Sequence, residues 1–136
     1  MRIPVALVGL LALLACRDPY DFAPGDPSKP DPPAGPVPLY PPSAERIDNW
    51  GYPQDVEMGW TAVSGAAGYQ VEVYTESIPE PPYRYTMVDQ IVGPAVSVTF
   101  YTYGWYYWRV RAVSPNWNWY TDWSELWSFA LPNPAR

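Results

Sequence analysis

Apolar and polar residues alternate in five runs between residues 54 and 131, and clusters of Pro, Gly, Asn and Ser separate the runs. A period of two indicates half-buried antiparallel strands, whereas no window has the i, i+3, i+4, i+7 spacing of an amphipathic helix. Several short strands in about 90 residues predict a two-sheet sandwich. The residues expected to face its core are Val56, Met58 and Trp60; Tyr69, Val71 and Val73; Val96, Val98 and Phe100; Tyr106, Trp108, Val110 and Ala112; and Trp127, Phe129 and Leu131.

The chain before these runs has no hydrophobic periodicity. Ten of the 28 positions in 17–44 are proline. Such a composition favours polyproline II, and at about 3.1 Å per residue the segment would form a semi-rigid spacer of about 85 Å. A docking site for a proline-binding partner is the alternative interpretation. We therefore expect a linker over 16–44 and one folded domain over 45–136.

One region of the expected domain lacks a clear pattern. Residues 76–93 contain Pro79, Pro81 and Pro82. Proline has no N–H to donate to a strand ladder, so it is confined to sheet edges and loops. The sequence predicts a loop or a broken edge strand here.

Residues 1–15 have the parts of a secretory signal: a basic residue (Arg2), an apolar stretch from Val5 to Leu14 that is too short to span a bilayer, and a small residue before Cys16. The run Leu13-Leu14-Ala15-Cys16 resembles the lipobox of bacterial lipoproteins. That resemblance implies cleavage before Cys16, lipidation of its thiol and a membrane anchor. An ordinary signal peptide with a chance cysteine is the alternative. Arg17 is no inner-membrane retention signal, so we expect the outer membrane or the cell surface.

The composition excludes several kinds of chemistry. Cys16 is the only cysteine and there is no histidine, which removes disulfides from the folded part, Ser-His-Asp and Cys-His nucleophiles, and zinc sites built on His or Cys. A pair of carboxylates could still cleave glycosides, but the acidic residues are scattered. We expect no enzyme activity, no metal and no cofactor. The net charge of −6 without a basic stripe disfavours nucleic acid as a partner.

Three stretches resemble parts of a fibronectin type III domain. Trp60-Thr61-Ala62-Val63-Ser64-Gly65-Ala66 with the following Gly68–Val73 is similar to strands B and C of that family, and Phe100 to Ala112 is similar to the turn before strand F and strand F itself. Asp122–Phe129 is similar to the last strand of bacterial members. The resemblance implies an all-β, immunoglobulin-like antiparallel sandwich of about seven strands. It also implies that Trp60 is a core residue and that Tyr106 is a tyrosine-corner residue.

Strand F carries a second resemblance. Arg109 and Arg111 alternate with core residues, so both should point outward with Trp105 and Tyr107. The run Trp123-Ser124-Glu125-Leu126-Trp127-Ser128 is similar to the WSxWS box of cytokine-receptor domains, where strand-F arginines stack between tryptophans. We therefore expect Arg109 or Arg111 to stack on Trp123, Trp105 or Tyr107, with about 0.5–2 kcal/mol gained for each stack.

The remaining aromatic residues are candidates for a contact surface. The candidate residues are Trp117, Trp119 and Tyr120 in the expected F–G loop and Trp105 and Tyr107 on the outer face of strand F. Tyr101 and Tyr103 should lie at the opposite end of the sandwich. Exposed Trp and Tyr dominate interface hot spots, which favours an envelope protein or protein complex as partner. A polysaccharide held by flat rings and by Asn116, Asn118 and Asp122 is the second hypothesis, and a secondary hydrophobic cluster is the third.

Overall fold

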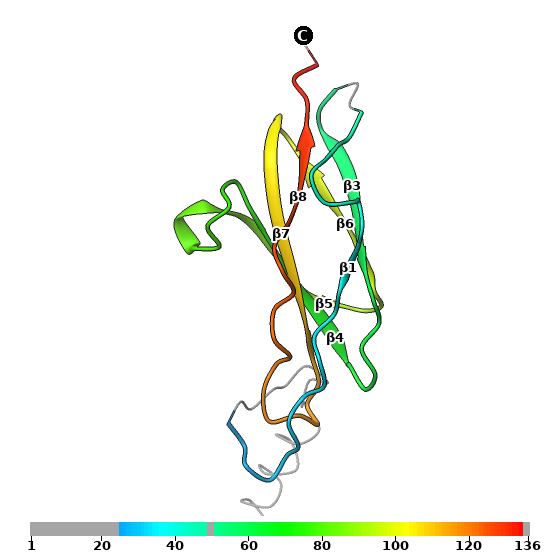
Figure 1. The fold of residues 1–136 in the computed structure, drawn as a ribbon, viewed down its shortest axis with the longest axis vertical. Helices are drawn as coiled ribbons and strands as arrows, with labels where there is room; N and C mark the ends of the chain where they lie inside the picture. The colour runs from blue at the N-terminus through cyan, green and yellow to red at the C-terminus, as the bar shows by residue number, and fades with distance from the viewer. Residues whose placement is uncertain (1–24, 49–50, 135–136) are drawn as a thin grey trace, which may run out of the picture.

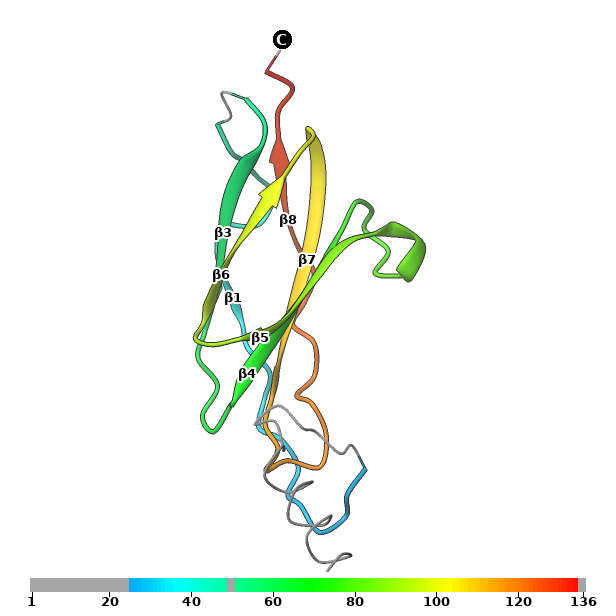
Figure 2. The same cartoon turned by 180° about the vertical axis from the view of Figure 1, so that it is seen from behind.

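The computed structural model describes residues 25–48 and 51–134, so the expected signal segment 1–15 and Cys16 lie outside the described residues. The described chain forms two sheets, one of three strands in the order β1-β3-β6 and one of five in the order β2-β8-β7-β4-β5 (Figures 1 and 2). The elements are β1 (Pro38–Tyr40), β2 (Glu45–Arg46), β3 (Gln54–Trp60), β4 (Gly68–Tyr74), the 3₁₀ helix η1 (Pro81–Tyr83), β5 (Arg84–Ile91), β6 (Ala95–Phe100), β7 (Gly104–Val113) and β8 (Trp127–Leu131).

The predicted all-β sandwich is confirmed. The inward residues of the five alternating runs meet between the two sheets, and aromatic rings fill much of that space. The Trp60 ring lies 5.4 Å from that of Tyr69 and 6.3 Å from that of Trp108, centroid to centroid. The Tyr106 hydroxyl donates to the carbonyl of Thr102 at 2.6 Å, which is the geometry of a tyrosine corner.

The sandwich begins earlier in the chain than the expected linker allows. Strand β1 lies within 16–44 and pairs antiparallel with β3, with Pro38 opposite Trp60. Proline is tolerated here because β1 is the last strand of its sheet, so one side of its backbone needs no ladder partner. Gly59 adds room, since a Cβ at this position would collide with the Tyr40 ring that crosses it. The proline-rich composition therefore does not mark a free spacer as far as residue 44.

The region 76–93 divides into two parts. Residues 75–83 form a loop that ends in η1, and Arg84–Ile91 forms β5, an edge strand whose pairing with β4 has two irregularities. The β4–β5 hairpin projects sideways from the sandwich in both views (Figures 1 and 2). The two predicted alternatives, a loop and a broken edge strand, each describe one part of this region.

Candidate functional site

A ladder of stacked side chains runs along the outer face of β7. The guanidinium carbon of Arg109 lies 4.2 Å from the ring centroid of Trp123, and that of Arg111 lies 4.3 Å from the same centroid. Arg111 also lies 3.7 Å from the ring centroid of Tyr120. The expected stacking partner Trp123 thus serves both arginines, while Trp105 and Tyr107 are not part of the ladder.

Glu72 of β4 fixes Arg109 from the side. Its carboxylate accepts hydrogen bonds from Nε and Nη2 of Arg109, at 3.0 and 2.8 Å, and from the Tyr74 hydroxyl at 2.7 Å. Arg84 of β5 adds a fourth donor at 3.3 Å. Glu72 is only 8% exposed, so these hydrogen bonds replace the water that its carboxylate loses on burial. The pairing of Glu72 with Arg109 in the β4–β7 register brings the two side chains to one face.

Arg111, two residues further along β7, is also bound by a polar side chain of β4. Its Nε donates to the Gln70 side-chain oxygen at 2.8 Å, and Gln70 is opposite Arg111 in the register of β4 and β7. Burial is the main reason why the pKa of Arg111 is lowered from its ordinary value. Tyr120, expected at a contact surface, instead covers one side of this guanidinium and is half-buried. The guanidinium groups of the ladder are therefore already bound by side chains of the domain itself.

The expectation that Trp117 is exposed is wrong. Trp117 is 6% exposed and belongs to the hydrophobic core. The loop between β7 and β8 (residues 114–126) turns back, with the Trp117 N–H bonded to the Ser114 carbonyl, and the ring meets the turn that contains Gly65. Burying a tryptophan ring removes a large apolar area from water, and this stabilises the inward position even though the residue lies in a loop.

The N-terminal segment 25–37 packs against the same loop. The Asn118 carbonyl accepts from the Gly25 N–H at 2.7 Å, the Asn118 N–H donates to the Pro30 carbonyl at 2.9 Å, and the Asn118 side chain donates to Asp31. Gly35 passes so close to Asp122 that a Cβ would collide with its carbonyl oxygen. We call this end of the sandwich, formed by residues 114–126 and 25–37, the near end.

Trp119 and Tyr120 do not form a flat platform. Trp119 is 51% exposed, but its ring stands at 89° to that of Tyr120, with 5.8 Å between the centroids. Asn118, expected to bind sugar hydroxyls, is bonded to the N-terminal segment. Stacking on a saccharide from this loop needs two or three coplanar rings, so the near end does not offer the expected arrangement.

At the other end of the sandwich three aromatic residues are exposed to solvent. Tyr101 is 69% exposed, Tyr103 56% and Trp105 41%; these three residues are called the far-end aromatics. They lie in the turn between β6 and β7 and at the start of β7. Since β7 has ten residues at about 3.4 Å each, about 30 Å separates them from the near end. Tyr107, further along β7, is half-buried.

Reasoning from the sequence missed the partners of the arginines. Gln70 and Glu72 point outward on β4, directly opposite Arg111 and Arg109 on β7. The spacing in the sequence does indicate this pairing: two polar residues two apart on one strand can face two arginines two apart on the neighbouring strand. Tyr74 and Tyr120 carried no comparable signal.

Within the described residues, no group of three or more His, Cys, Asp and Glu side chains could hold a metal ion. The described part of the chain also contains no helix with the length and apolar character needed to cross a membrane.

The strand order of the two sheets and the tyrosine corner at Tyr106 are those of a fibronectin type III-like β-sandwich. No known family model matches the chain, and no curated protein matches it. Among solved structures, an Fn3-like protein from Clostridium thermocellum is 24% identical, with 76% of this chain and 97% of that chain covered and a TM-score of 0.48. The fibronectin(III)-like modules of Clostridium thermocellum CbhA are 17% identical, with 71% and 93% covered and a TM-score of 0.48.

Proposed function

We propose that the protein is a bacterial lipoprotein, anchored through Cys16, whose sandwich is a non-catalytic module that contacts an envelope protein. The observation that carries this proposal is the exposure of Tyr101, Tyr103 and Trp105 at the far end. Exposed tyrosine and tryptophan combine a large apolar area with a polar tip, and they are enriched in the energetic centres of protein interfaces. We therefore propose the far end as the contact surface, in place of the loop at 114–126.

The path of the N-terminal segment supports this choice of surface. Segment 25–37 lies along the near end, where the Gly25 N–H donates to the Asn118 carbonyl (Figure 1). Eight residues separate Cys16 from Gly25, and the nine Cα–Cα steps between them can span at most about 32 Å. A lipid on Cys16 would keep the near end close to the membrane. The far-end aromatics would then point away from it, toward a partner.

The anchor is tested by Cys16→Ser, which removes the only thiol that could be acylated. Two or more acyl chains hold a protein stably on a membrane, so this variant should move from the membrane fraction to the soluble fraction. Immunoblotting of both fractions checks this. Retention of the variant on membranes would contradict the anchor.

The contact is tested by purifying the tagged full chain from its own membranes in mild detergent, with mass spectrometry of what co-purifies. A stoichiometric protein should accompany the wild type and Trp119→Ser, and it should be lost from the double variant Tyr103→Ser/Trp105→Ser. Trp119 is the matched control because it is as exposed as Tyr103 but lies at the near end. A partner that survives the double variant would place the contact elsewhere.

A further inference from the structure

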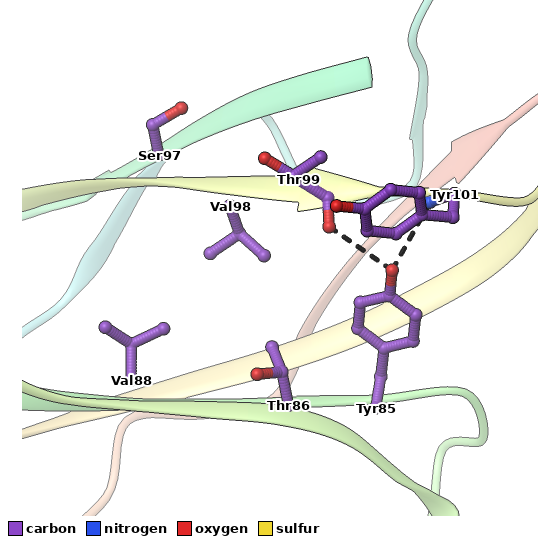
Figure 3. Close-up of a pocket in the computed structure, with 7 residues that line it drawn as sticks. All are labelled: Tyr85, Thr86, Val88, Ser97, Val98, Thr99 and Tyr101. Carbon is purple, nitrogen blue, oxygen red and sulfur yellow. Dashed lines mark hydrogen bonds between the residues drawn. The ribbon is translucent and has the colours of Figure 1, made fainter. Parts of the chain in front are cut away.

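A pocket of about 420 Å³ lies on the open side of the sandwich, between β5 and β6 (Figure 3). These are the last strands of the five-stranded and the three-stranded sheet, so no further strand closes this side within the described residues. Two tyrosines, two threonines, two valines and one serine line the pocket, and none of these side chains is charged. Its volume is in the range of sites for small molecules.

The floor of the pocket is apolar and has one hydroxyl beside it. Val98 projects from β6 toward β5, and Val88 and Thr86 project from β5 toward β6 (Figure 3). Val98 is buried, whereas Val88 and Thr86 are half-buried. Within the described chain the Thr86 hydroxyl makes no side-chain hydrogen bond, so it is available to a ligand as donor and acceptor.

Tyr85 forms a fixed wall at one end. Its ring stacks on Phe100 with 5.1 Å between centroids, and its hydroxyl donates to the Thr99 carbonyl at 3.2 Å and accepts from the Tyr101 N–H at 3.3 Å (Figure 3). These two backbone groups therefore face away from β3, on the free edge of β6. Tyr85 occupies that part of the edge.

The free edge continues beyond Tyr85. Backbone groups of residues two apart on a strand point to the same side, so the N–H and C=O of Ser97 face the same edge as those of Thr99. Strand β3 pairs with the opposite side of β6 and cannot satisfy them. One wall of the pocket thus offers the backbone N–H and C=O of Ser97, and the other wall offers the Thr86 hydroxyl.

We propose that this pocket binds one ring of a neutral saccharide. Pyranose rings have apolar C–H faces and a rim of hydroxyls, which match the valine floor, the exposed Tyr101 ring at the mouth and the polar groups of Thr86 and Ser97. The uncharged lining disfavours phosphates and sugar acids, because a charge brought there would lose water without gaining a partner. An added peptide strand needs several free edge groups in a row, and Tyr85 interrupts them.

This site goes beyond the protein contact proposed above, and it is tested separately from it. The full chain in detergent is titrated with cellotriose, maltotriose, chitotriose, the charged trigalacturonate and an alternating Thr/Val hexapeptide, with backbone amide signals followed by NMR. At least one neutral saccharide should shift signals of residues 85–88 and 97–101. Trigalacturonate and the hexapeptide should leave these signals in place.

Thr86→Val and Tyr103→Ser separate the pocket from the far-end contact, whereas the Tyr101 ring belongs to both. Tyr101→Ser should weaken binding of the neutral saccharide about tenfold, and Thr86→Val, which keeps the shape, about fivefold. Tyr103→Ser is the matched control and should change the affinity by less than about twofold, since Tyr103 does not line the pocket. The proposal is overturned if no neutral saccharide shifts these signals, if the acid or the peptide shifts them equally, or if Thr86→Val and Tyr101→Ser both bind like the wild type.

Discussion

The two ends of the sandwich use aromatic residues in opposite ways. At the near end Trp117 enters the core, Trp123 and Tyr120 stack on arginines, and the segment 25–37 covers the loop. At the far end Tyr101, Tyr103 and Trp105 remain in solvent. Whether a ring is structural or available depends on its partners: Trp117 meets the turn that contains Gly65, and Trp123 packs on two arginines.

The largest effect is expected from removing the buried ring of the near end. Trp117→Ala should lower the free energy of unfolding by about 3–5 kcal/mol, because it leaves a cavity in the core. Trp119→Ala, two residues away and half-exposed, should cost less than about 1 kcal/mol. Urea unfolding of both variants gives the comparison. Equal losses of stability would contradict the burial of Trp117 and the exposure of Trp119.

The ladder should contribute less than the core. Trp123→Ala removes the shared ring from Arg109 and Arg111 and should cost about 1–3 kcal/mol, since each cation–π contact contributes about 0.5–2 kcal/mol. Trp105→Ala on the same face of β7 is the control and should cost less than about 1 kcal/mol. Thermal unfolding measures both. A loss from Trp105→Ala that matches that of Trp123→Ala would show that both rings are structural.

The packing of the N-terminal segment depends on Gly35. Gly35→Ala would force its new Cβ against the Asp122 carbonyl. The N-terminal segment should then shift away from the loop, and the free energy of unfolding should fall by about 1–2 kcal/mol. Hydrogen exchange should then accelerate at the Asn118 and Thr61 amides, which bond to Pro30 and Val37. Ala34→Ser at the neighbouring exposed position should leave exchange unchanged. Unchanged exchange in Gly35→Ala would mean that the near end is covered without this close approach.

The smallest effect concerns the hydroxyl that holds the far-end turn. Tyr106→Phe removes the hydrogen bond to the Thr102 carbonyl and should cost about 0.5–1.5 kcal/mol. Burial raises the pKa of Tyr106 from 10.0 to about 12. The unfolded chain therefore loses this proton first, and stability should fall as the pH rises from 10 to 12. The melting temperature of Tyr106→Phe should fall less over this range, and an equal fall would contradict the assignment.

The sequence sufficed for the core but not for the ends. Period-two alternation identified β3, β4, β6, β7 and β8, because one face of each strand is buried. Strand β1 was missed because it lies in a proline-rich segment, and a strand at a sheet edge tolerates proline since it has only one ladder partner. Trp117 was misplaced because loop tips are usually polar, and nothing local to that loop indicates that its ring turns inward. The pocket between β5 and β6 depends on where two distant edges meet, which no local pattern reports.

The most direct test of the far end as contact surface is site-specific photo-cross-linking in the protein's own membranes. Benzoylphenylalanine replaces Tyr103 in one full-length chain and Trp119 in another, and cross-linked species are identified by mass spectrometry after irradiation. The proposal predicts one cross-linked envelope protein of defined mass from position 103 and none from position 119. The same protein captured from 119 alone, or no protein from 103, would contradict it.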